Sequence, residues 1–251
     1  MSRKLLVITG PTATGKTALG IELAKKFNGE ILSADSQQVY TGNDIETGKD
    51  KSYFQWGIDI ANPGTDFNVS AFVSYAHRVI ADITKRKKLP IVVGGSGQYI
   101  KELLNPSETL NITPNQKLRT RLAKYSVSQL QKLVNPEACG KMNSSDWQNP
   151  RRLVRAIEVQ SAKRKIKIKY PQYDTLVIGL TAPREILYKK IVTRRENRPD
   201  LIPKEFSYSK RQMLYLQKYL QPLWFDVSDE KSHNRILWEV NKFLAPPKKI
   251  K

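Results

Sequence analysis

The sequence predicts an α/β fold in which helices flank a parallel sheet and a small helical insertion interrupts the chain. The first observation is a buried strand, Leu5–Ile8, that is followed by a helical pattern over 17–27 and a second strand over 30–34. A strand, a helix and a strand in succession imply a right-handed parallel crossover. The second observation is another strand, Ile91–Val93, that runs directly into a helix over 98–104. Both units are typical of a parallel sheet with helices on its faces.

The third observation is a change of pattern in the middle of the chain. From Asn105 to about Pro171 the sequence shows helices and polar connections, and a strand over Leu176–Leu180 then returns the chain to the sheet. We therefore expect a core formed by residues 1–104 and 172–251 and a mainly helical, basic insertion over 105–171. The remaining expected elements are helices over 69–86, 183–195, 207–219 and 233–244, a short strand over 57–60 inside a long loop, and a terminal strand over 223–227.

Length and composition limit the classes of protein. The chain has 251 residues, of which 39% are hydrophobic, so it can bury a sizeable core. No run of eighteen apolar residues is present, which argues against a membrane span. The first strand starts within five residues, which leaves no room for a signal peptide, and the single cysteine, Cys139, is compatible with a reducing compartment. We expect a cytoplasmic protein, a monomer, without a membrane partner.

Charge is unevenly distributed along the chain. The formal net charge is +20, and residues 1–100 hold 12 basic and 9 acidic residues, whereas residues 101–251 hold 31 and 14. A basic excess on this scale indicates a nucleic-acid or other anionic partner. No basic helix with an extended aromatic and leucine face is present, so a nucleic acid is the better candidate.

The loop after the first strand fits the phosphate-binding pattern G-x-x-x-x-G-K-[ST] at every fixed position. Its glycines let the backbone curl so that amide groups point inward, and the following helix N-terminus favours an anion. Lys16 adds a mobile positive charge, and the hydroxyl of Thr17 is suited to Mg²⁺. The motif predicts a P-loop NTPase-like sheet with a phosphorylated ligand, and the ligand-binding residues are Gly10, Thr12, Ala13, Thr14, Gly15, Lys16 and Thr17.

Two further candidate groups lie at strand ends. Asp35 follows the second strand, where it could either cap a turn or take part in chemistry. The run Gly94–Gly97 follows the strand Ile91–Val93 and should lie beside the phosphate-binding loop, because ligands bind at the carboxyl ends of parallel strands. In the insertion, a helix opened by Asn149 and Pro150 carries three arginines within five residues, a cluster that favours an anionic partner.

Taken together, these motifs resemble the tRNA dimethylallyltransferase, or tRNA isopentenyltransferase, family. Order and spacing agree from Met1 to about Val227. The matching segments are Gly10–Thr17, Ser33–Tyr40, Asp44–Lys49, Ile58–Ile60, Val93–Tyr99, Asn149–Val159, Arg211–Gln212 and Trp224–Asp226. The resemblance implies transfer of a dimethylallyl group from dimethylallyl diphosphate to N6 of adenine 37, next to the tRNA anticodon, with release of diphosphate.

The resemblance also implies roles for individual residues. Asp35 would accept the proton from the adenine amine, and Lys16, Ser96 and Arg194 would stabilise the departing diphosphate, with Mg²⁺ on Thr17. The anticodon stem-loop would lie against residues that match the family's tRNA-contacting positions, namely Asp35, Ser36, Gln37, Gln38, Ser96, Arg119, Arg151, Arg152, Leu153, Val154 and Arg155.

The chain departs from the family pattern at several points. Ser96 stands where the family usually has threonine, and Gln37 stands where it has methionine. Gln55–Gly57 replaces a pair of histidines, and only seventeen residues lead from Arg194 to Arg211, where relatives carry a much longer helical segment. We therefore expect a shortened member of the family.

Other functions are compatible with parts of the pattern. A small-molecule or nucleotide kinase uses the same loop with ATP, but it needs no strongly basic surface elsewhere. Prenyl transfer to free adenine nucleotides is a second alternative, which the arginine-rich helix disfavours. A catalytically idle tRNA-binding relative is a third, and the joint presence of Lys16, Thr17 and Asp35 argues against it.

Overall fold

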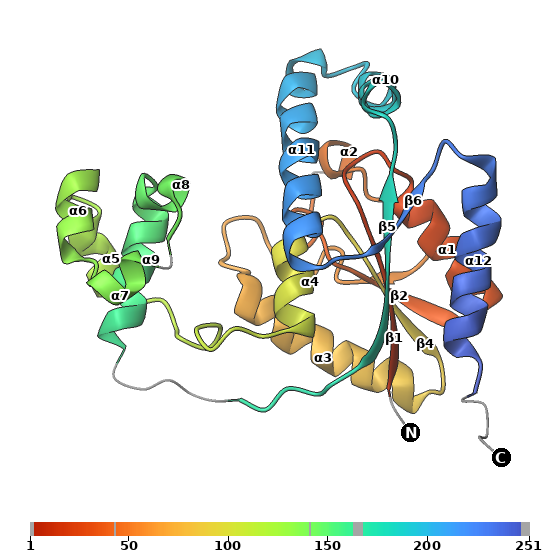
Figure 1. Cartoon of the computed structure of the whole chain (residues 1–251), viewed down its shortest axis with the longest axis horizontal. Helices are drawn as coiled ribbons and strands as arrows, with labels where there is room; N and C mark the ends of the chain where they lie inside the picture. The colour runs from red at the N-terminus through yellow and green to blue at the C-terminus, as the bar shows by residue number, and fades with distance from the viewer. Residues whose placement is uncertain (1–2, 43, 141, 163–167, 247–251) are drawn as a thin grey trace. The chain divides into compact units, whose positions relative to one another are not determined.

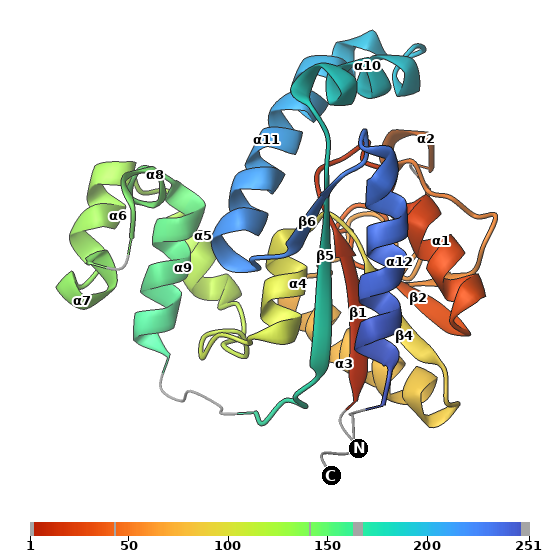
Figure 2. The same ribbon diagram turned by 45° about the vertical axis from the view of Figure 1, so that its right-hand side comes forward.

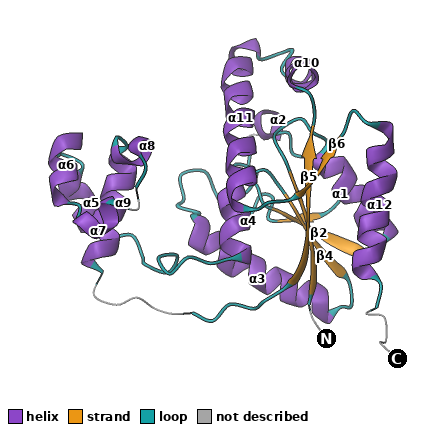
Figure 3. Cartoon of the chain, viewed as in Figure 1, coloured by secondary structure: helices purple, strands orange, loops and turns teal. Residues whose placement is uncertain are grey.

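A parallel sheet of six strands forms the centre of the first of two compact units (Figure 1, Figure 3). The computed structural model describes residues 3–42, 44–140, 142–162 and 168–246. In spatial order the strands are β3 (Gln55–Trp56), β2 (Gly29–Ser33), β4 (Leu89–Val93), β1 (Lys4–Thr9), β5 (Asp174–Thr181) and β6 (Leu223–Asp226). Because all neighbouring strands pair in parallel, their carboxyl ends meet at one edge of the sheet.

Helices cover both faces of this sheet, which gives three layers (Figure 1, Figure 2). Helices α1 (Lys16–Lys26) and α12 (Glu230–Leu244) pack on one face. Helices α3 (Val69–Lys85) and α4 (Gly97–Leu104) lie on the other, and α11 (Ile202–Tyr219) contacts α4. Helix α10 (Arg184–Arg194) follows β5 and joins α11 through a short 3₁₀ turn, Pro199–Leu201.

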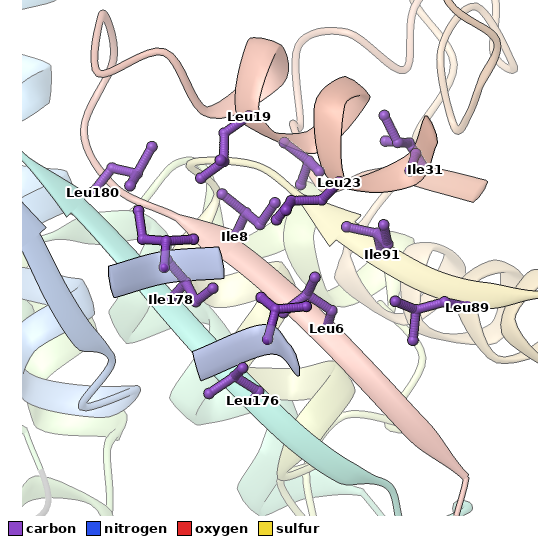
Figure 4. Packing of buried hydrophobic residues seen from close by; sticks show 14 of the residues in the cluster. Leu6, Ile8, Leu19, Leu23, Ile31, Leu89, Ile91, Leu176, Ile178 and Leu180 are labelled. Atoms are coloured by element: carbon purple, nitrogen blue, oxygen red, sulfur yellow. The ribbon is translucent and has the colours of Figure 1, made fainter. Parts of the chain in front are cut away.

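The core follows from alternation along the strands. Successive side chains of a strand point to opposite faces, so Leu6 and Ile8 meet α1 and α12, whereas Leu5 and Val7 face the other layer. Figure 4 shows Leu6 and Ile8 packed with Leu23 of α1. Each fully buried aliphatic side chain contributes about 1.5–3 kcal/mol of transfer free energy, so this cluster holds the phosphate-binding edge rigid.

The structure corrects the expected strand over 57–60. The strand in this region is β3, Gln55–Trp56, and residues 57–59 form turns and bends. Gly57 and Asp59 both adopt positive φ angles, of 87° and 56°, which a strand excludes. Asp59 instead accepts a hydrogen bond at 2.6 Å from Lys49, a lysine with a fully buried side chain that also bonds Asp44 of the short helix α2 (Asp44–Thr47).

The second compact unit, Ser107–Tyr170, is helical where it is described. It contains α5 (Gln116–Leu122), α6 (Val127–Leu133), α7 (Pro136–Cys139), α8 (Ser144–Trp147) and α9 (Pro150–Ser161). Its core consists of Leu122, Leu130, Val134, Leu153 and Ile157. As expected, Asn149 caps α9 by accepting hydrogen bonds from the amides of Arg151 and Arg152.

Candidate active site

The loop between β1 and α1 curls as the phosphate-binding motif predicts. Gly10 and Gly15 adopt positive φ angles of 146° and 84°, and a Cβ atom at Gly10 would collide with the carbonyl oxygen of Leu180. Ala13 also has a positive φ, 65°, a strained conformation for a residue other than glycine. The buried hydroxyl of Thr14 donates to the carbonyl of Pro11 at 2.9 Å and fixes the turn. The strain lies where the backbone must turn its amides toward a ligand.

Lys16 lies across this loop. Its Nζ atom donates to the carbonyl of Pro11 at 2.6 Å. Burial lowers the pKa of Lys16 to about 8. The negative charges of Asp35 and Glu205 oppose this shift, and the positive charge of Arg194 adds to it. An anion at the loop would raise this pKa again, because an opposite charge favours the protonated amine.

Asp35 and Ser96 come together at the carboxyl ends of β2 and β4. Asp35 caps the turn that follows it, because its Oδ1 accepts hydrogen bonds from the amides of Gln37 and Gln38 at 2.9 and 3.4 Å. The Ser96 hydroxyl accepts from the amide of Ser36 at 2.9 Å. Gly94 permits this approach, since a Cβ there would collide with the backbone of Ala34. Asp35 thus caps a turn, and its side chain also lines the cavity described next.

One cavity of about 500 Å³ joins these parts. Its wall includes the phosphate-binding loop, the ends of β2 and β4, part of the loop after α2, and helices α10 and α11. The lining residues used below are Thr12, Ala13, Gly15, Lys16, Thr17, Asp35, Gln38, Asp50, Lys190, Arg194, Tyr208 and Gln212. A phosphate-binding loop and a carboxylate therefore open into the same space.

Arg194 reaches this cavity from the last turn of α10. Its Nη1 atom donates to the hydroxyl of Thr12 at 3.2 Å. Its guanidinium also lies so close to Gly48 that a Cβ atom there would collide with it. Of the four residues expected to act together, Lys16, Asp35 and Arg194 line one cavity, and Ser96 is not part of its lining.

The glutamine side chains that were expected to meet the adenine differ in position. Gln38 lines the cavity, but its amide is held by the protein: Nε2 donates to the carbonyl of Thr47 at 3.2 Å and Oε1 accepts from Ser33 at 3.0 Å. Gln37 is exposed and does not line the cavity. Ser36 is half-buried beside Ser96.

Helix α11 supplies site residues that the sequence analysis did not assign. Gln212 accepts from the amide of Thr12 at 2.9 Å and donates to the carbonyl of Gly95 at 3.0 Å. Tyr208, one turn earlier, bonds Ser96 and Gln212, and burial raises its pKa. Lys190 lies one turn before Arg194 and lines the cavity. The spacing of four residues in each pair was the available signal, since it places both side chains on one helix face.

In the helical unit, Arg119 and Arg155 are bonded within the protein. Arg119 and Arg155 both contact the buried carboxylate of Glu158, with nitrogen–oxygen distances of 2.6 and 3.2 Å. Burial alone would raise the pKa of Glu158, but hydrogen bonds from Arg119, the Asn115 amide and Arg155 hold it below its usual value. Arg155 also donates to the carbonyls of Thr109 and Ile112.

The other insertion residues fall into two groups. Arg151 and Arg152 are exposed, and Arg152 is paired with Asp146. Leu153 is fully buried in the core of the unit and Val154 packs against that core. We therefore correct the expectation that Leu153 contacts tRNA through its side chain: every fourth residue of α9 faces inward, and this is one of them.

The donors at the phosphate-binding loop fit a magnesium–phosphate ligand. The half-buried Thr17 lines the cavity together with the carboxylates of Asp35 and Asp50. Oxygen ligands of this kind suit Mg²⁺, which keeps several waters and binds largely through substrate phosphates. In the part of the chain that the structure describes, no cluster of three or more His, Cys, Asp or Glu could hold a metal by itself.

Fold and cavity define an α/β protein of the P-loop NTPase-like class with a site for a phosphorylated ligand. Comparison with known families is consistent with this. The family model described as IPP transferase matches residues 38–200, and the model described as isopentenyl transferase matches residues 3–53. The chain belongs to the IPP transferase family.

Similar proteins carry related names. The chain is 41% identical over 203 residues to tRNA dimethylallyltransferase 1 of Geotalea daltonii, and 39% identical over 195 residues to tRNA dimethylallyltransferase of Leuconostoc mesenteroides. These matches cover 78% and 75% of this chain, and 66% of the length of each relative. The chain therefore matches about two thirds of their length.

Solved structures agree in fold. The full-length tRNA isopentenylpyrophosphate transferase of Bacillus halodurans is 27% identical, with a TM-score of 0.66 over 96% of this chain and 95% of that one. A eukaryotic dimethylallyltransferase acting on tRNA is 21% identical, with a TM-score of 0.75 over 99% of this chain and 82% of that one. The latter likeness shows the fold alone.

Among the described residues, no helix is both long and apolar enough to cross a membrane.

Proposed function

We propose that this chain transfers a dimethylallyl group from dimethylallyl diphosphate to N6 of adenine 37 in tRNA. The observation that carries the proposal is the shared cavity, in which the phosphate-binding loop and Arg194 face a carboxylate, Asp35. A small-molecule kinase would not need the strongly basic composition that this chain has after residue 100. Family membership and the names of the relatives support the same reaction.

The reaction needs a base and a stabilised leaving group. The adenine amine attacks the first carbon of the prenyl group while the carbon–oxygen bond to diphosphate breaks, and the amine proton passes to Asp35. The amides of Gln37 and Gln38 hold Asp35 in place, and both of those bonds use the same oxygen, Oδ1. A fixed carboxylate is suited to proton transfer because it needs no reorganisation in the transition state.

Negative charge grows on the diphosphate as it leaves. Lys16, the loop amides and Arg194 supply preorganised donors at that position. We propose that Ser96, which bonds the amide of Ser36 next to Asp35, adds a further donor. We propose that Thr17, which lines the cavity, would help to hold Mg²⁺ at the diphosphate. When bound, this ion supplies Lewis-acid stabilisation of the leaving group.

The tRNA is the second substrate. The adenine must leave its stack to enter a cavity of this kind, and the net charge of +20 favours a polynucleotide over a free nucleotide. We propose that the helical unit, 107–170, binds the anticodon stem-loop through Arg119, Arg151, Arg152 and Arg155, and that Ser36, Gln37 and Gln38 contact the displaced base. A tRNA substrate favours the cytoplasm, and we propose that the protein is a monomer.

A competition between acceptors tests the function. Purified protein is incubated with Mg²⁺ and dimethylallyl diphosphate, and is offered unmodified tRNA, an anticodon stem-loop or AMP. We expect isopentenyladenosine in tRNA, less in the stem-loop, and none from AMP. Prenylation of AMP alone would identify a free-nucleotide enzyme. In a parallel reaction with added ATP, ATP consumption without prenyl transfer would identify a kinase. Tight tRNA binding without any reaction would indicate an idle relative.

A further inference from the structure

Glu205 is a buried carboxylate at the edge of the phosphate-binding loop, and the mechanism above does not use it. Its side chain is 9% exposed. Oε1 accepts a hydrogen bond from the hydroxyl of Thr12 at 2.8 Å, and it lies 3.4 Å from Nη1 of Arg194. Oε2 accepts from Nε of Arg195, whose side chain is also buried. A buried carboxylate thus contacts the loop and two arginines at once.

These contacts join the phosphate-binding loop to two neighbouring helices that lie 182 to 193 residues later in the sequence. Thr12 belongs to the phosphate-binding loop, Arg194 and Arg195 lie at the end of α10, and Glu205 lies in the first turns of α11. The connection between α10 and α11 is short, and the pair Arg195–Glu205 closes it. Burying an ion pair such as Arg195–Glu205 costs desolvation free energy. We therefore expect an ion pair buried beside a functional site to have a role other than general stability.

The two oxygens of Glu205 have different partners. Oε2 is directed to Arg195, which compensates the negative charge of the carboxylate. Oε1, Thr12 and Arg194 form a triangle, since Nη1 of Arg194 also donates to the Thr12 hydroxyl at 3.2 Å. The side chain of Arg194 is 31% exposed, so without these contacts it would sample several rotamers.

We infer that Glu205 is a positioning residue: it holds the guanidinium of Arg194 and the hydroxyl of Thr12 at the phosphate-binding loop before a diphosphate enters. Arg195 balances its charge, so that the carboxylate does not repel the incoming anion. Glu205 touches neither the reacting carbon nor the adenine in this arrangement. Preset donors of this kind raise affinity because less conformational freedom is lost on binding.

The inference rests on the proposed function in one respect, the identity of the anion. It is therefore tested with inorganic diphosphate as the probe, by calorimetry on the full chain. If the unchanged protein does not bind diphosphate, the proposed function fails. If it binds and the Glu205 variants behave like the parent, only the inference fails.

A double-mutant cycle distinguishes a Glu205 that positions Arg194 from a Glu205 that only stabilises the fold. Glu205→Gln removes the charge at constant shape, and we expect a loss of about tenfold in diphosphate affinity, the scale for one long side chain that is no longer preset. In an Arg194→Gln background the same change should have almost no further effect, because the guanidinium that Glu205 positions is absent. In the parent background we also expect kcat/KM for dimethylallyl diphosphate to fall with little change in KM for tRNA.

Two further variants keep the inference testable if Glu205→Gln does not fold. Glu205→Asp keeps the charge opposite Arg195 but withdraws the carboxylate by one methylene, so affinity should fall while the melting temperature stays close to that of the parent. Asp200→Asn is the matched control, because it removes an exposed acid that pairs with Arg198 outside the cavity. It should leave diphosphate affinity unchanged.

Equal losses from Glu205→Gln in both backgrounds would overturn the inference, because they would show that the residue supports the fold and not Arg194. A gain in diphosphate affinity in the parent background would also overturn it, since the carboxylate would then act only as a repelling charge. Unchanged affinity in Glu205→Asp would argue against the Thr12 and Arg194 contacts.

Discussion

Asp35 fixes a local turn, and in the proposed mechanism it is also the base. The bonds that cap its turn use Oδ1 for both amides. The same side chain lines the cavity that contains Lys16 and Thr17. A residue that caps a turn has a restricted rotamer, and this is an advantage for a base that must meet its proton at a fixed place.

The substitution Asp35→Asn separates these two roles. The amide oxygen of the new side chain would still accept from the backbone amides of Gln37 and Gln38, so the turn and tRNA binding should remain close to the parent. A neutral amide cannot take the proton, and turnover should fall at least ~100-fold, the scale for a lost general base. Single-turnover kinetics with tRNA would measure this. An unchanged rate would remove Asp35 from the mechanism.

The arginines of the helical unit differ in what their loss should do. Arg151 is exposed on α9, and Arg151→Ala should weaken tRNA binding and reduce the slope of log affinity against log salt by about one. Arg155→Ala is the comparison, because it deprives Glu158 and two carbonyls of a partner and should lower the thermal stability of the protein. Titrations at several salt concentrations would decide, and equal slopes for Arg151→Ala and the parent would exclude a phosphate contact.

At the scale of elements, an ion-pair cluster fastens β2 to the end of α3. Glu30 bonds Arg86, Lys88 and the indole of Trp56. The hydrogen bond from Arg86 lowers the pKa of Glu30 to about 2, from 4.5, against the opposing effect of burial and with help from Lys88 and Trp56. Because the folded-state pKa is depressed, this contribution to stability is full above about pH 4.5 and is lost as pH falls toward 2.

Glu30→Gln should therefore destabilise the protein at neutral pH. We expect a loss of about 1–2 kcal/mol at pH 7, discounted for the partial exposure of the cluster, and almost no difference from the parent near pH 2. Urea unfolding at a series of pH values would measure it. A difference between the two proteins that does not depend on pH would contradict the assigned cause.

The sequence predicted the elements whose signals are local. The phosphate-binding loop follows a buried strand and leads into a helix, so the order of residues specifies it. The strand expected over 57–60 was wrong because its apolar spacing hid the positive φ angles of Gly57 and Asp59. The side chain of Asp59 is instead bonded to Lys49, a contact from elsewhere in the loop. The bonds of Glu205 and Gln212 to Thr12 join residues about 200 positions apart, and no local pattern reveals such contacts.

At the scale of the whole molecule, the topology of the sheet determines where the cavity lies, and the distribution of charge indicates the kind of partner. The parallel sheet brings the loops after β1, β2 and β4 to one edge, and α10 and α11 complete the cavity there. The basic excess, in contrast, lies after residue 100. Composition could indicate a polyanionic partner, but only the structure shows that Arg119, Arg152 and Arg155 already have acidic neighbours within the protein.

The central claim is that the phosphate-binding loop holds a diphosphate that departs while carbon moves to tRNA. The most direct measurement counts both products in one reaction: diphosphate released, and isopentenyladenosine found by mass spectrometry after nuclease digestion of the tRNA. We predict equal amounts of the two products, with the modification at adenine 37 and no need for ATP. Phosphate released from ATP, with no prenyl group on the tRNA, would contradict the account.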